Sequence, residues 1–189
     1  ISKFEAIKKA EKDLKEAIAK IKGEMLTQFD EGFKKINTNF QRIFKELFGG
    51  GNAMLEIDYT GVEDRLEAGV EIIAQPPGKK LQKLSLLSGG EKALTAIAIL
   101  FSILKLRPMP FCVLDEIEAA LDEANVDRFA RYLKKFSEET QFIVITHRKP
   151  TMELADALFG VTMQEKGISK MVSVKLSDVA EFNNDQSLA

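Results

Sequence analysis

The amino-acid sequence predicts an α/β fold in which a mainly parallel sheet is flanked by helices and preceded by a long helix. Residues 1–48 lack proline and place apolar residues at helical spacing. Residues 111–145 follow a strand–helix–strand pattern with unbroken apolar strands, which is typical of a parallel βαβ unit. Between these regions, a serine and two glycines precede a long apolar run. We therefore expect a first helix over residues 1–48 and a globular lobe over residues 53–189.

The first helix is predicted from apolar residues that recur at steps of three and four. From Phe33 onward the steps alternate as in a heptad repeat, whereas Ile21 to Phe33 advances by four each time, a stutter that locally unwinds a coiled coil. We expect a short coiled-coil segment that runs into a helix packed on a domain; a simple surface helix is the alternative. Because the pattern begins without a cap or an initiating Met, we also expect a fragment of a longer protein. The apolar positions are Ile18, Ile21, Met25, Phe29, Phe33, Ile36, Phe40, Ile43 and Leu47.

The region after the first helix begins with glycines at 49–51, which stop the helix and mark a boundary. Residues 53–59 and 69–74 predict an antiparallel pair of strands. The prolines in 75–80 interrupt that pattern, because proline lacks a ladder donor. Residues 93–106 are apolar almost all the way round, which predicts a helix in the interior.

The second half of the chain is predicted to hold the parallel pair. Residues 111–114 and 142–145 read as continuous buried strands on either side of a helix over 122–136. Pro150 suits the first turn of a short helix. A closing hairpin around Gly167, with strands at 159–164 and 171–176, and a polar tail from Asn183 complete the chain.

Composition narrows the class of protein. The net charge of −2 gives no whole-chain reason to expect nucleic acid. Cys112 is the only cysteine, which excludes an intrachain disulfide, favours a reducing compartment and, mid-strand, suits a packing residue better than a reactive thiol. The longest apolar run lies between Lys92 and Lys105, well short of the roughly 18–20 residues that cross a bilayer. We find no signal peptide and expect a soluble, intracellular protein without a membrane partner.

The first candidate site is Ser88-Gly89-Gly90-Glu91, directly before the apolar helix. Serine followed three residues later by glutamate fits a capping box, which is a purely structural feature. A cap does not require the paired glycine, however, and glycine lets the backbone approach a phosphate closely. The two interpretations are compatible, since a capped helix N-terminus is also an anion site.

The second candidate site is Asp115-Glu116, at the end of a strand. Buried carboxylates are costly without a cation or hydrogen-bond donors. Asp115 suits Mg²⁺, bound through water, and Glu116 suits a general base or orienting group for an attacking water. A strand end that simply emerges into solvent is the alternative. Because successive side chains on a strand point opposite ways, both carboxylates can serve one site only if the chain bends just after Asp115.

Two further residues are candidates by position. Asp122 is an easy N-cap for the helix that follows it. His147, the only histidine, follows the second apolar strand; it is either structural or able to reach a γ-phosphate or the attacking water. No Gly-x-x-x-x-Gly-Lys-[Ser/Thr] occurs in the sequence. Without such a phosphate loop the chain cannot cradle the β-phosphate of its own nucleotide, so we expect half of an active site to be supplied by other polypeptide.

Leu87–Lys92 and Phe111–Glu116 resemble the signature motif and the Walker B motif of ABC-type ATPases. The full order of motifs resembles the C-terminal half of the ATPase head of SMC (structural maintenance of chromosomes) proteins, of the bacterial condensin type. The resemblance extends from about Asn37 to Asp178. It rests on the run Ala74–Leu81, the signature at Leu87–Lys92, the Walker B strand with Asp115-Glu116, the D-loop Ala120-Leu121-Asp122 and the switch region Thr146-His147-Arg148.

The resemblance implies a role for each candidate residue. Glu116 and His147 would be catalytic, Asp115 would hold Mg²⁺ through water, and Asp122 would belong to the D-loop that communicates across a dimer. The signature residues, which would contact the nucleotide of an opposite head, are Ser88, Gly89, Gly90 and Glu91.

The resemblance also implies ATP and Mg²⁺ as cofactors and several partners. These are an N-terminal Walker A lobe of the same head, a second head in an ATP-dependent homodimer, a kleisin subunit on the C-terminal lobe, and DNA. The implied function is chromosome condensation and segregation in the cytoplasm, at the nucleoid. A double-strand-break repair ATPase, a transporter nucleotide-binding domain and a non-catalytic docking module are the alternatives.

Overall fold

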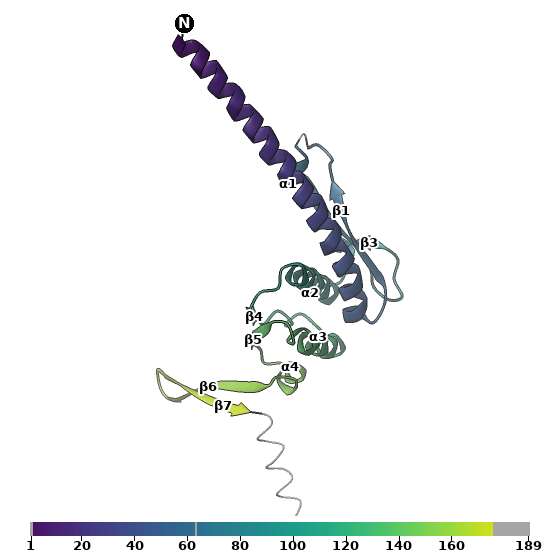
Figure 1. The fold of residues 1–189 in the computed structure, drawn as a ribbon. Helices are drawn as coiled ribbons and strands as arrows, with labels where there is room; N and C mark the ends of the chain where they lie inside the picture. The colour runs from purple at the N-terminus through teal and green to yellow at the C-terminus, as the bar shows by residue number, and fades with distance from the viewer. Residues whose placement is uncertain (1, 63, 176–189) are drawn as a thin grey trace, which may run out of the picture. The chain divides into compact units, whose positions relative to one another are not determined.

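The computed structural model describes residues 2–62 and 64–175 (Figure 1). The described chain divides between Arg107 and Pro108 into two compact units, called unit 1 and unit 2. The predicted tail from Asn183 and the predicted last strand residue, 176, lie outside the described residues. Within the described residues, no helix has the length and apolar character that crossing a membrane requires.

Unit 1 consists of two helices and a small antiparallel sheet. Its elements in chain order are α1 (Ser2–Phe48), β1 (Asn52–Asp58), β2 (Gly69–Gln75), β3 (Gln82–Lys83) and α2 (Gly89–Leu106), with 3-10 turns at Arg65–Glu67 and Leu84–Leu86. β1 pairs with β2 from Asn52↔Gln75 to Asp58↔Gly69, and β2 pairs with β3. The predicted antiparallel pair is therefore confirmed; β3 was not predicted.

The two halves of α1 differ in their surroundings. In the second half, a run of apolar side chains is fully buried, and the side chain of Asn37 holds β1 by accepting from Leu55 N at 2.9 Å and donating to Leu55 O at 3.3 Å. In the first half, by contrast, apolar side chains are exposed, and the helix projects past the sheet of unit 1 (Figure 1). The buried residues are Phe40, Ile43, Phe44 and Leu47; the exposed ones are Phe4, Ile7, Leu14, Ile18, Ile21 and Met25.

Glycines end α1 with a defined geometry. Gly49 is left-handed (φ 69°) and Gly50 N donates to Lys45 O at 2.9 Å, the six-to-one bond of a Schellman motif. Gly51 (φ 79°) lies so close to β2 that a Cβ there would be 2.2 Å from Gln75 O. Only glycine fits at this position.

α2 is not covered all the way round, which corrects the expected interior helix. Ile103 is exposed on one side, while the opposite side is buried. The buried residues are Leu94, Thr95, Ile97, Ala98, Phe101, Ser102 and Leu104.

Unit 2 contains the predicted βαβ unit, followed by a short helix and a hairpin. Its elements are β4 (Phe111–Asp115), α3 (Glu123–Phe136), β5 (Gln141–Ile145), α4 (Lys149–Glu153), β6 (Ala157–Glu165) and β7 (Ile168–Lys175). β4 and β5 are parallel, with Phe111 opposite Gln141 and Asp115 opposite Ile145, so the βαβ prediction is confirmed. β6 and β7 are antiparallel and turn at Gly167 (φ 85°), as predicted.

Two expectations about the strands are wrong. The sheet is not mainly parallel: in the described residues β4–β5 is the only parallel pair, because the short connections elsewhere permit antiparallel neighbours and only α3 provides a crossover. The apolar strands are also not buried on both faces. Leu114 is covered, whereas Phe111 and Val113 are 55% and 53% exposed, and Ile143 and Ile145 are 50% and 52% exposed on β5. The unbroken apolar sequence of these strands means that both faces of the β4–β5 sheet are apolar, but this chain covers only one of the two faces.

Candidate functional site

The start of α2 is a complete capping box. Ser88 Oγ accepts from Glu91 N at 3.4 Å, and Glu91 Oε2 accepts from Ser88 N at 3.0 Å and from Ser88 Oγ at 2.7 Å. Ser88 and Gly89 are exposed and Gly90 is half-buried. A Cβ at Gly89 would meet no atom within 4 Å, so the fold itself does not require glycine there. The helix start therefore presents open backbone to an approaching molecule.

Lys79 completes this site and was not predicted as part of it. Its ammonium lies 2.9 Å from Glu91 Oε1 and donates to Oε2 at 3.0 Å. Burial alone would raise the pKa of Glu91, but hydrogen bonds from Lys79 and Ser88, with the charge of Lys79, outweigh it and hold that pKa below its ordinary value of 4.5. Lys79 lies in the loop after β2, so the loop and the helix cap are joined by one ionised carboxylate.

The carboxyl ends of β4 and β5 form the second site. Asp115 is the last residue of β4, and the chain turns at Glu116, whose φ of 46° is the only positive value at a non-glycine residue in the described chain. Glu116 N donates to Ile145 O at 3.0 Å. The bend that both carboxylates require is therefore present, and a strained residue of this kind is typical of a functional site.

Glu116 and His147 meet at this edge of the sheet. Glu116 Oε1 lies 3.3 Å from His147 Nδ1, and the two side chains are 54% and 65% exposed. Asp115 is also exposed. Two of the predicted residues are thus in direct contact, with a third at the end of the same strand, and all three are accessible to a ligand.

Asp122 lies at the start of α3 and caps it. Its carboxylate accepts from Asn125 N at 2.9 Å and from Asn125 Nδ2 at 3.1 Å, which confirms the predicted N-cap. Asp122 is exposed. The Ser88–Glu91 group belongs to unit 1 and the carboxylates belong to unit 2, so the structure describes them as two sites.

A buried carboxylate that the sequence analysis missed lies behind the second site. Glu118 is fully buried, and its Oε1 accepts from Thr146 Oγ1 at 2.5 Å and from Thr151 Oγ1 at 3.2 Å. Its only sequence signal is a glutamate among Ile117, Ala119 and Ala120, just after the bend.

Comparison with known proteins decides the family. A family model described as the RecF/RecN/SMC N terminal domain matches residues 6–170. This chain belongs to the RecF/RecN/SMC family. It is 62% identical over 178 residues to the chromosome partition protein Smc of Bacillus subtilis (strain 168) and 57% identical over 171 residues to that of Desulfitobacterium hafniense (strain Y51). These matches cover 94% and 90% of this chain but only 15% and 14% of the relatives.

Solved SMC heads have the same fold. An Smc head domain with an extended coiled coil, bound to the C-terminal domain of ScpA and derived from Pyrococcus furiosus, matches with a TM-score of 0.79 and 41% identity over 98% of this chain and 46% of that chain. A structure from work on ATP-driven dimerization and DNA-stimulated activation of SMC ATPases matches with a TM-score of 0.72 and 42% identity over 85% of this chain and 96% of that chain. The fold is therefore that of an SMC ATPase head, with mixed sheets.

Membership of an ATPase family implies that a nucleotide binds together with Mg²⁺. The side chains present fit an ion that is held jointly by the protein and the nucleotide phosphates, and not a metal site built from protein ligands alone. Asp115 offers one exposed carboxylate, and no group of three or more His, Cys, Asp or Glu in the described residues could hold a metal ion. Mg²⁺ commonly keeps several waters and takes one or two carboxylates together with substrate phosphates. Asp115 would supply the protein ligand of this chain.

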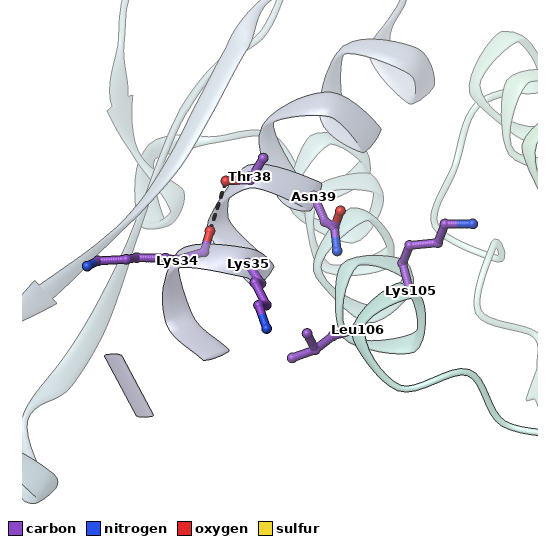
Figure 2. A pocket seen from close by; sticks show the side chains of 6 residues that line it. All are labelled: Lys34, Lys35, Thr38, Asn39, Lys105 and Leu106. Carbon is purple, nitrogen blue, oxygen red and sulfur yellow. Dashed lines mark hydrogen bonds between the residues drawn. The ribbon is translucent and has the colours of Figure 1, made fainter. Parts of the chain in front are cut away.

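A pocket in unit 1 is lined by none of the predicted site residues. Its lining comes from α1 and the last turn of α2 (Figure 2). Because the C-terminal end of a helix carries partial negative charge, a lysine there complements the helix dipole, which accounts for Lys105 without a ligand. The lining residues are Lys34, Lys35, Thr38, Asn39, Lys105 and Leu106.

Cys112 behaves as the sequence analysis expects of a packing residue. It is half-buried on β4, and burial raises the pKa of its thiol. A raised pKa leaves the thiol protonated and unreactive near neutral pH.

The lowered pKa of Glu91 predicts an acid-sensitive helix cap in this SMC-family fold. A lowered folded-state pKa adds stability above the unfolded value, and that stability is lost as the pH falls from 4.5 through the folded value. Glu91→Gln should therefore unfold with a smaller difference in free energy between pH 7 and pH 3 than the unchanged chain, measured by urea denaturation followed by circular dichroism.

A matched control uses the exposed pair of Lys83 and Glu71, which are 2.8 Å apart. Exposed ion pairs contribute little, so Glu71→Gln should leave the pH dependence almost unchanged. Equal effects of the two substitutions would contradict the role of the Lys79–Glu91–Ser88 contacts.

Proposed function

We propose that this chain is the C-terminal half of an SMC ATPase head, carrying the signature and Walker B motifs. With an N-terminal Walker A lobe it binds and hydrolyses ATP between two engaged heads, and so drives chromosome organisation, condensation and segregation. The matching family model is named for an N-terminal domain; we assign the C-terminal half because the sequence holds both later motifs and no phosphate loop.

The observation that carries this proposal is the bare face of the β4–β5 sheet. Parallel sheets are normally covered on both faces, and four large apolar side chains are about half exposed on this one (Phe111, Val113, Ile143 and Ile145). Fully burying an exposed side chain of this kind is worth roughly 1.5–3 kcal/mol, and about half of that gain remains to be made at each of the four, so the exposed face favours a permanent partner. The Walker A lobe is the occupant we propose, since Asp115, Glu116 and His147 lie at the carboxyl ends of these strands, where α/β sheets bind ligands.

The site residues suit a reaction divided between two heads. Glu116 accepts a proton from, or orients, the water that attacks the γ-phosphorus, with His147 beside it. Asp115 would hold Mg²⁺ through water, and the ion would supply positive charge to the nucleotide phosphates of the same head. Ser88, Gly89 and Gly90 present a hydroxyl and open backbone at a helix N-terminus to the γ-phosphate of the other head. Asp122 couples the two sites across the dimer.

The projecting half of α1 supports a coiled-coil arm. Its exposed apolar residues continue the helical spacing of the buried half, so a second helix would cover them. The proposed partners are that helix, a kleisin subunit on the C-terminal lobe and DNA. Related Smc heads solved with ScpA domains, and work on ATP-driven dimerization and DNA-stimulated activation of SMC ATPases, support these partners. We propose a cytoplasmic location at the nucleoid. The chromosome partition relatives favour this function over break repair.

The proposal predicts that the chain alone binds ATP negligibly, because it has no loop to hold the β-phosphate. Adding an equimolar N-terminal lobe that carries a phosphate loop should produce ATP hydrolysis. Fluorescent-nucleotide anisotropy and phosphate release measure the two results. Robust turnover by the chain alone, at a rate that Glu116→Gln abolishes, would contradict the divided site.

A further inference from the structure

Glu118 occupies a position that packing does not explain. It is fully buried, and its Oε2 has no hydrogen-bond partner among the described residues. Burial of a carboxylate costs free energy unless its interactions compensate, and an apolar side chain of similar size would avoid that cost.

The hydroxyl of Thr146 accepts one hydrogen bond and donates another. Its hydroxyl oxygen accepts from Arg148 N at 3.0 Å, so its proton is available for Glu118 Oε1, which lies 2.5 Å away. Arg148 Nη2 also donates to Leu121 O at 3.0 Å. The residues on both sides of His147 are thus bound to the loop that follows β4.

The side chain of His147 makes few contacts in the described residues. Its ring is 65% exposed, and within the described residues its one polar side-chain contact is Glu116, at 3.3 Å. Its position therefore depends on the backbone between Thr146 and Arg148.

We propose that Glu118 is a positioning residue, which holds Thr146 against the loop after β4 and, together with the bond from Arg148 to Leu121, sets where His147 meets Glu116. The kinetic part of this inference rests on the proposed ATPase function. The positional part does not, because it concerns the geometry of this chain alone.

Two threonines provide a matched test. Thr146→Val and Thr151→Val each remove one hydroxyl bonded to Glu118 Oε1 and keep the shape of the side chain. Thr146→Val also removes the acceptor of Arg148 N, so substitutions of Glu118 itself are needed to isolate the carboxylate. With ¹³C-histidine incorporated into this chain, His147 gives the one histidine Cε1–H cross-peak, in the chain alone or with an unlabelled Walker A lobe. Thr146→Val should move this peak by more than its line width. Thr151→Val, which leaves the bond between Thr146 and Glu118, should leave the peak in place.

Two substitutions of Glu118 complete the test. Glu118→Ala should move the cross-peak in the same direction as Thr146→Val, while Glu118→Gln, which keeps an acceptor oxygen, should move it less than Glu118→Ala. If Glu118→Ala fails to fold, Glu118→Gln takes its place, and a peak that it leaves unmoved while Thr146→Val displaces it would count against Glu118. Equal displacements by both valine variants, or none by either, would overturn the proposal.

The kinetic arm uses the head assembled with the Walker A lobe. Glu118→Ala should lower kcat about tenfold with little change in KM, a fraction of the roughly 10²–10⁴-fold that a general base contributes. In a His147→Ala background the same substitution should have no further effect, because the two act through one position. An equal loss in both backgrounds would overturn positioning through His147. Expected cross-peak displacements without any hydrolysis in the assembled head would contradict the proposed function and leave the positional inference intact.

Discussion

Replacing Glu116 with glutamine is expected to slow ATP hydrolysis by the assembled head by about 10²-fold or more, while the ATP-bound dimer becomes more abundant. Glutamine keeps the size of the side chain but cannot take a proton. Glu116 lies at the bend after β4, beside His147. ATP should still bind, because no phosphate-binding group is altered, and slower hydrolysis leaves the engaged state populated.

Phosphate release and sedimentation velocity with ATP measure the two effects. Glu153→Gln is the control: this exposed carboxylate on α4 is paired with Lys149 at 3.4 Å, and its replacement should change hydrolysis less than twofold. A slow Glu116→Gln head that gains no ATP-dependent dimer would count against Glu116 as the base.

Replacing Ser88 with arginine is expected to abolish the ATP-dependent dimer while ATP binding stays within about twofold. Ser88 is exposed at the start of α2, and the added side chain would fill the space beside Gly89, where a Cβ would meet no atom within 4 Å. Loss of the N-cap also costs about 0.5–2 kcal/mol of stability.

Two controls separate these causes. Ser88→Ala removes the cap without adding bulk and reports its cost in thermal unfolding. Ser85→Arg introduces the same side chain at an exposed serine three residues earlier and should leave dimerization unchanged. If Ser88→Arg leaves the fraction of ATP-dependent dimer unchanged, the motif serves only as a helix cap.

Most helices and strands could be predicted from the sequence because their apolar spacing, caps and turns depend on residues that are close together in the chain. Helical spacing and the closing glycines placed α1 over Ser2–Phe48, and the capping residues Ser88 and Asp122 act as predicted. The bend at Glu116 followed from the need to bring adjacent strand residues to one site.

What could not be predicted depends on partners distant in sequence. The bare face of β4–β5 has the same apolar residues as a covered one, so sequence alone cannot tell which face this chain covers. Glu118 resembles a solvent-exposed glutamate until Thr146 and Thr151 are placed beside it. Lys79 was visible only as part of a proline-containing loop, and its bond to Glu91 arises from the return of that loop to α2.

The three glycines after α1 do not form an unconstrained linker, because Gly49 and Gly50 close the helix and Gly51 packs against Gln75. α1 is one continuous helix of 47 residues, about 70 Å long at 1.5 Å per residue. In its C-terminal part, the Asn37 side chain is hydrogen-bonded to both backbone polar groups of Leu55, and after the helix Gly51 packs closely against Gln75. We therefore expect a displacement at the far end of α1 to be passed to β1 and β2 through these contacts.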